Sequence, residues 1–176
     1  GTVTLTGQVN GPRDAPSATA AVTSDEIRWQ HLTVQALALS LAATREGATI
    51  ESASMGLGTG ILDVRGSYAL DSGRANASAT WRDVPVDAIA VISQSPLGRT
   101  KLSGQADLDA LLSDGARTIG LDASISADTA GTRTLDGRLS LSSTGDTWRA
   151  RTTLTLPGDA RMHGELTGVV PESGVT

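Results

Sequence analysis

The sequence predicts an all-β protein built as one elongated, curled antiparallel sheet with an apolar interior. Apolar and polar residues alternate along nearly the whole chain, and this period of two places every second side chain on one face of a sheet. A glycine also stands in the middle of five strand-like segments, flanked on each side by a polar and then an apolar residue. These segments are residues 5–9, 64–68, 102–106, 135–139 and 162–166.

The central glycines and the low aromatic content both bear on what the apolar face is for. A glycine inside a strand marks a bend or a close approach to the backbone, so repeated glycines would let a wide sheet curl into a trough. Aromatic residues make up 2% of the chain, with three Trp, one Tyr and no Phe. Small aliphatic residues coat a surface but fill a thick sandwich core poorly. Two interpretations remain, a thin sandwich rich in Leu and Ala, or an open groove that another molecule fills.

The alternation gives the order of the predicted strands, joined as a meander by Gly- and Asp-rich turns. We expect strands over residues 2–9, 17–23, 32–43, 48–55, 61–70, 75–81, 102–108, 119–125, 135–141, 148–156 and 162–166. Asp25 and Glu26 are interpreted as a turn, and residues 56–60 as a glycine-rich reversal. Trp29 lies in a short segment that the pattern does not assign, whereas Trp81 and Trp148 fall on the apolar face.

The alternation is interrupted once, and we expect a short helical break near residues 84–93. Val86, Ile89 and Ala90 follow a helical spacing, and Pro85 suits the first helical position. Asp83 stands where an N-cap residue would be expected. The strand pattern resumes after this segment.

Length and charge limit the possible roles. We expect residues 1–168 to form a single β-rich segment, cut from a longer protein, and residues 169–176 to be a tail or the start of a next unit. The net charge of −5 and the pI of about 4.9 argue against nucleic acid, or an anionic membrane surface, as the main partner. No stretch of 18 apolar residues is present to span a membrane.

The residues offer no chemistry for an enzyme, a metal or a cofactor. Cysteine is absent, and His31 and His163 are far apart with no acidic residue at metal-ligand spacing. Asp107 and Asp109 share a face, but their neighbours supply no further ligands, so a solvated surface is expected. The glycine-rich residues 56–60 lack the lysine and helix of a phosphate-binding loop.

The apolar face is therefore the candidate functional surface. The residues expected to line a groove are Leu5, Leu37, Leu39, Leu41, Leu62, Val64, Leu102, Leu121, Ile125, Leu139, Leu154 and Leu166. An acyl chain gains about 0.8 kcal/mol for each CH₂ that it buries, so a continuous apolar trough can hold one without specific contacts.

The repeated strand–Gly–strand units, together with residues 81–89 (WRDVPVDAI) and 96–104 (PLGRTKLSG), resemble the AsmA-like/TamB superfamily of bacterial envelope proteins. The resemblance covers residues 1–168. It implies a taco-shaped sheet that conducts phospholipid across the periplasm, between the inner and outer membranes. The full-length protein would be anchored in the inner membrane. An older view of the family implies assembly of outer-membrane β-barrels and autotransporters, with a barrel assembly protein as partner. The family's typical C-terminal domain and its N-terminal anchor are not evident in this sequence.

Two further hypotheses stay open beside the lipid groove. One is a structural or adhesive β-rich spacer with a self-filled core, whose Thr- and Ser-rich face makes the contacts. The other is a scaffold that offers a sheet edge to nascent outer-membrane β-strands by β-augmentation.

Overall fold

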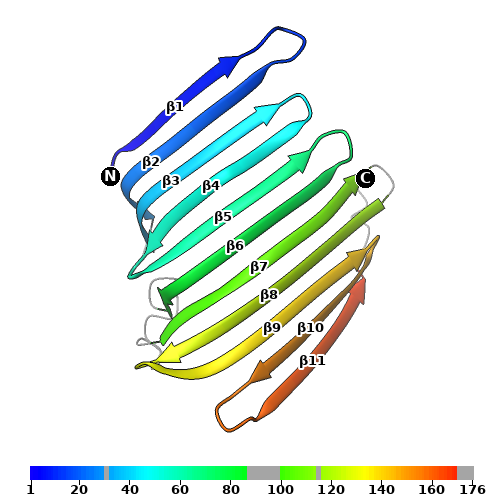
Figure 1. Cartoon of the computed structure of the whole chain (residues 1–176). Coiled ribbons are helices and arrows are strands. Elements are labelled where there is room, and N and C mark those ends of the chain that lie inside the picture. The colour runs from blue at the N-terminus through cyan, green and yellow to red at the C-terminus, as the bar shows by residue number, and fades with distance from the viewer. Residues whose placement is uncertain (30–31, 87–99, 114–115, 170–176) are drawn as a thin grey trace.

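A computed structural model describes residues 1–29, 32–86, 100–113 and 116–169 of the chain. They form eleven strands: β1 (Val3–Asn10), β2 (Ser17–Trp29), β3 (Leu32–Thr44), β4 (Gly47–Leu57), β5 (Gly60–Ala69), β6 (Arg74–Pro85), β7 (Thr100–Ser113), β8 (Ala116–Thr129), β9 (Thr132–Thr144), β10 (Thr147–Thr155) and β11 (Arg161–Val169). Each strand is antiparallel to its neighbours in the order β1 to β11, which makes one meandering sheet (Figure 1).

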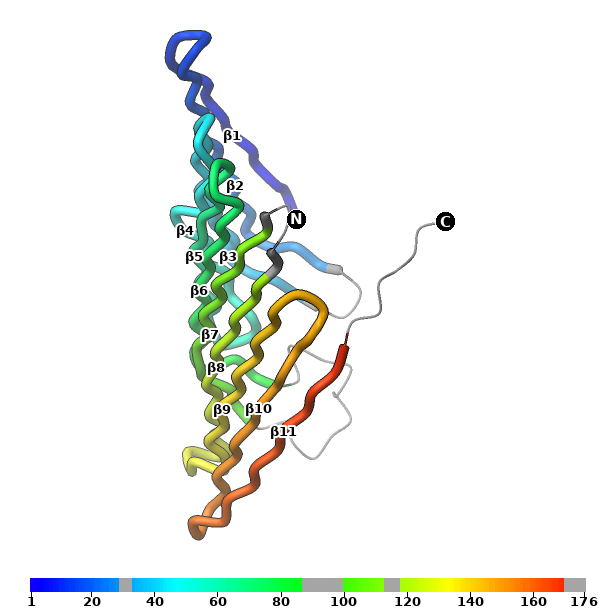
Figure 2. The backbone as a smooth tube through the Cα atoms, turned by 90° about the vertical axis from the view of Figure 1, so that its right-hand side faces the viewer, coloured from blue at the N-terminus to red at the C-terminus, as the bar shows by residue number. Residues whose placement is uncertain are grey.

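The predicted all-β class and the antiparallel sheet are confirmed. The sheet is open, with β1 and β11 as its two edges. Figure 2 shows the sheet nearly edge-on as a single bowed layer, with β1 and β11 inclined to the same side. The expected curl is therefore present, and it creates a concave side and a convex side.

Backbone hydrogen bonds show which face of the sheet is concave. Consider a strand of L-residues that runs upward in the view. A residue whose backbone N–H and C=O point to the right has its side chain toward the viewer, and a residue whose N–H and C=O point to the left has its side chain away from the viewer. In Figure 1, β7 runs toward the upper right with β6 on its left, and the N–H of Leu112 in β7 donates to the Gly73 carbonyl at 2.8 Å. Leu112 and the alternate residues Ala110 and Leu108 therefore point away from the viewer, which is the concave side in Figure 2. The apolar face is the inner face of the bend.

A single layer leaves both faces of this sheet without a closed core. The chain exposes 12176 Å², whereas a compact monomer of 17.9 kDa is expected to expose about 8,000 Å². Within the described residues, the buried apolar side chains are Ala53, Val84, Val86, Ala110 and Ala127. This set is too small to be the core of a sandwich, so the thin-sandwich interpretation does not describe this structure.

The second strand is longer than the sequence pattern predicted. The expected turn at Asp25 and Glu26 is wrong, because both residues lie inside β2, which continues to Trp29. Glu26 pairs with Gln35 and Ile27 with Val34 of β3, so pairing with β3 resumes directly after Asp25. Two consecutive acidic residues suggested a turn by composition, but pairing with β3 holds the backbone extended.

The strict alternation expected along β3 is also interrupted. Ala36 has a φ of 48° and lies at a register shift between β3 and β4, next to Gln35 and Ala38. Val34 pairs with Leu57 on one side of this irregularity, and Leu39 pairs with Ala53 on the other. The bulge therefore returns Val34, which is out of phase with Leu39, to the apolar face.

The first residues of the expected helical break, Val84 and Pro85, are not helical. Val84 and Pro85 still belong to β6, and Val86 lies in a 3₁₀ turn, while residues 87–93 fall outside the described part of the chain. Asp83 is not an N-cap. It has a φ of 52°, and its N–H donates to the Ser103 hydroxyl at 3.0 Å, next to a register shift between β6 and β7.

Candidate functional site: an open apolar groove

Pairing between strands brings the apolar residues into continuous rows that run across the sheet. We call the longest of these the central row. It crosses all eleven strands through Leu5, Val22, Leu39, Ala53, Val64, Ala79, Ala106, Ala123, Leu139, Thr152 and Gly164. Ten steps between neighbouring strands, at about 4.8 Å each, give it a length of about 48 Å.

Two further rows flank the central row on the same face. The first runs through Gly7, Ala20, Leu41, Ile50, Gly66, Ala77, Leu108, Leu121, Leu141, Ala150 and Leu166. The second runs through Met55, Leu62, Trp81, Gly104, Ile125, Gly137, Leu154 and Met162. The three rows together contain no charged residue, and the Thr152 hydroxyl and the Trp81 indole N–H are their only side-chain hydrogen-bond donors.

The structure places all twelve predicted groove residues on this one face. Ten of them belong to the three rows. The other two are Leu37, which pairs with Ser24, and Leu102, which pairs with Val84 and Ala127 beside the second flanking row. The sequence pattern therefore selected residues that the fold brings to a common surface.

None of the twelve groove residues is buried by the described structure. Leu5, Leu139 and Leu166 are exposed, with exposed fractions of 70%, 42% and 67%, and the other nine are half-buried. In a filled core, side chains of this size would be nearly inaccessible. The inner face is therefore an open apolar surface on which these twelve side chains remain accessible.

Gly104 and Gly137 in mid-strand, and Gly168 near the end of β11, lie beneath large side chains from neighbouring strands on the inner face. A Cβ atom placed on Gly104 would lie 2.6 Å from Cζ2 of Trp81, which pairs with it in β6. The same construction on Gly137 would meet Ile125 at 2.8 Å and Leu154 at 3.0 Å, and on Gly168 it would meet the Trp148 ring at 2.6 Å. Each of these three glycines lets a neighbouring large side chain lie close to the backbone.

Several lining residues were missed by the sequence analysis, among them Val22, Ile50, Leu108 and Leu141. Their alternation was visible, but Val22 lies in a strand of small residues and Ile50 is next to a register shift. The placement of Trp81 over Gly104 had no sequence signal, since it depends on the pairing of β6 with β7.

The outer face carries the charged and hydroxyl side chains. Asp109 pairs with Arg74 at 3.1 Å, and both Asp107 and Asp109 are exposed, which is the expected solvated surface. His163 Nδ1 lies 3.2 Å from the Thr153 hydroxyl, while His31 falls outside the described residues. The described part of the chain holds no group of three potential metal ligands.

Comparison of this chain with protein-family models, with curated protein sequences and with solved structures gives no match. In the ranges that the structure describes, no helix combines the length and hydropathy needed to cross a membrane. The geometry of the groove is therefore the basis for assigning a function.

Proposed function

We propose that this chain is a segment of a bacterial envelope bridge-like protein, located in the periplasm, whose apolar groove binds phospholipid acyl chains and conducts them between the inner and outer membranes. The observation that supports the proposal is the central row, an uncharged path that crosses eleven strands and in which every residue except Ala53 is half-buried or exposed. An exposed apolar surface of this extent on a soluble domain usually has a binding role.

The dimensions of the groove suit an acyl chain. One acyl chain spans about half of the ~30 Å hydrocarbon core of a bilayer, which is about 15 Å. The central row, at about 48 Å, would hold such a chain at any of several positions along its length. Because the row has no charged or strongly polar position, neighbouring positions differ little in chemistry, which favours sliding over tight retention.

The polarity of the two faces also fits this role. Ala, Val and Leu dominate the inner face, whereas Arg65, Asp107 and Asp122 share a row on the outer face. A headgroup would remain in water at the open side of the groove while its chains contact the inner face. The rest of the protein, including an inner-membrane anchor, and a partner of the β-barrel assembly class both belong to this proposal and lie beyond these residues.

Substitution of groove residues by aspartate should remove bound lipid. We expect the wild-type chain, purified from bacteria without detergent, to carry phospholipid that native mass spectrometry and lipid extraction detect. The double variant Leu121→Asp/Leu139→Asp places two charges in adjacent rows, and its lipid content should fall at least tenfold, because a charge on the path of an acyl chain must be desolvated.

A matched control introduces the same charge on the other face. Ser142→Asp/Thr144→Asp alters two exposed β9 positions of the outer face and should keep the wild-type lipid content. Equal loss in both variants would show that net charge is responsible and would contradict the groove. A lipid-free, stable and monomeric wild-type chain would favour the structural spacer.

A further inference from the structure

The outer face of the last strands contains a polar hollow that the acyl-chain groove does not use. We call it the polar hollow and define it by Ser124, Arg138, Thr153, Thr155, Arg161 and His163, which line it on β8 to β11. Strand pairing sets these residues side by side. Arg138 pairs with both Ser124 and Thr153, Thr153 pairs with His163, and Thr155 pairs with Arg161.

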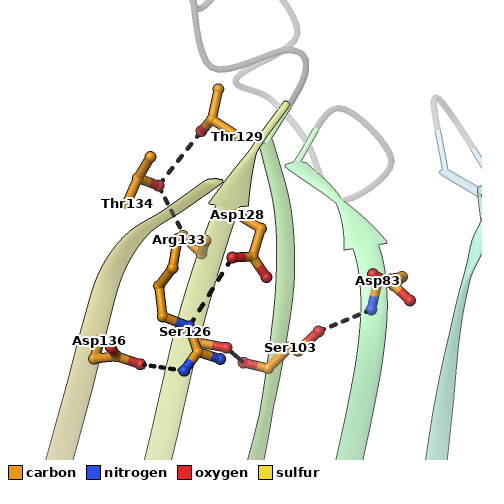
Figure 3. Close-up of polar contacts among 9 residues, drawn as sticks. Asp83, Ser103, Ser126, Asp128, Thr129, Arg133, Thr134 and Asp136 are labelled. Carbon is orange, nitrogen blue, oxygen red and sulfur yellow. Dashed lines mark hydrogen bonds and ion pairs between the residues drawn. The ribbon is translucent and has the colours of Figure 1, made fainter. Parts of the chain in front are cut away.

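The positive charges around the polar hollow differ in how they are compensated. Arg133 and Asp136 also line the hollow, and Arg133 lies between Asp128 at 4.0 Å and Asp136 at 3.5 Å (Figure 3). Arg149 and Arg151 share Glu165, at 3.3 and 3.4 Å.

By contrast, Arg138 and Arg161 have no carboxylate within 4.0 Å among the residues that the structure describes. These two guanidinium groups therefore retain their full capacity for an anion. They line the hollow from either side of β10, and the third lining arginine is Arg133, which Asp128 and Asp136 compensate.

Some of the hydroxyl groups that line the hollow already take part in hydrogen bonds within the protein. Ser103 accepts a hydrogen bond from the Asp83 N–H, and the Ser126 hydroxyl donates to the Ser103 carbonyl at 3.3 Å (Figure 3). The Thr153 hydroxyl lies 3.2 Å from His163 Nδ1, which orients the imidazole ring across β10 from Arg138. The floor of the hollow thus offers oriented polar groups between two uncompensated cations.

We propose that the polar hollow binds a phosphate ester. Arg138 and Arg161 stand on either side of β10, and register places their Cα atoms about 12 Å apart. Two long guanidinium side chains that approach from opposite sides suit a tetrahedral anion, because it presents oxygens in several directions. A planar carboxylate would be satisfied by one of them. The phosphate can belong to a soluble ester or to a phospholipid headgroup, and the chemistry of recognition is the same.

This site is independent of the groove, since it lies on the opposite face of the sheet.

Binding would be followed by NMR on the arginine Nε–Hε signals of the isotope-labelled chain, titrated with inorganic phosphate and with glycerol 3-phosphate at constant ionic strength. We expect saturable shifts. Arg138→Gln/Arg161→Gln should weaken binding at least tenfold, because each change removes charge-assisted hydrogen bonds. The control Arg149→Gln/Arg151→Gln removes two compensated cations from the same face and should change affinity less than twofold.

Vesicles distinguish the two sources of phosphate. If anionic phosphatidylglycerol vesicles recruit the chain and glycerol 3-phosphate competes with them, the ligand is a phospholipid headgroup. If only the free esters bind, the ligand is a soluble phosphate ester. Shifts that never saturate, or an Arg138→Gln/Arg161→Gln variant with wild-type affinity, would overturn the proposal. Loss of acyl-chain binding in the groove variants leaves these outcomes unchanged, so the two proposals fail separately.

Discussion

Replacing Gly104 by alanine should destabilise the sheet by about 3 kcal/mol. A Cβ atom at this position would lie 2.6 Å from Cζ2 and 2.8 Å from Cε2 of Trp81, and it would also collide with the backbone carbonyl of Ser124. The indole can move, but the carbonyl belongs to β8 and is held by the β7–β8 ladder. Relief therefore requires either displacement of Trp81 from the inner face or local breakage of the ladder.

The measurement is the urea midpoint of unfolding, followed by circular dichroism, with tryptophan fluorescence as a second probe. Gly7 is the matched control because it occupies the same position in the repeated pattern. A Cβ there would have only the Thr19 carbonyl nearby, at 3.4 Å. Gly7→Ala should leave stability unchanged or raise it by about 0.5 kcal/mol, since alanine loses less backbone entropy in a strand. Equal effects at both positions would show that Trp81 does not lie over Gly104.

Introducing a charge at Val84 should unfold or nearly unfold the chain. Val84 is 2% exposed, and its pairing with Leu102 of β7 comes just after the register shift that follows Trp81. Gly60 also approaches the Val84 backbone closely, since a Cβ on Gly60 would lie 2.5 Å from the Val84 Cα. An unpaired carboxylate there should cost about 4 kcal/mol or more, which is much of the stability of a typical domain.

The pH dependence of the Val84→Asp variant separates charge from shape. Burial raises the pKa of the introduced carboxyl above its value in the unfolded chain. The folded state then binds more protons than the unfolded state, so stability is partly restored as pH falls below the folded pKa and is lost as pH rises through it. Val9→Asp adds the same charge at a position that is 76% exposed and should change stability by less than about 0.5 kcal/mol. A Val84→Asp variant as stable as Val9→Asp would contradict the burial of Val84.

The sequence alone determined the fold class and the face on which the groove residues lie. Alternation is a local property, because successive side chains of an extended strand must point to opposite faces. Short Asp- and Gly-containing turns, such as the one after Asp71, then required neighbouring strands to be antiparallel. These two facts are sufficient to assign residues as distant as Leu5, Leu62 and Leu154 to one surface.

Tertiary structure decided what alternation could not encode. Asp25 and Glu26 had the composition of a turn, yet both lie in β2, where the flanking Ser24 and Glu26 pair with β3. Ala36 shifts the phase of β3 at a bulge. Both features depend on the neighbouring strand and not on the local residues. The same holds for Arg138 and Arg161, which lie on β9 and β11 and which strand pairing brings to either side of β10. Within an uninterrupted strand, the alternation of side chains determines the face on which a residue lies. The register between strands determines which residues are its neighbours, and only the assembled sheet determines that register.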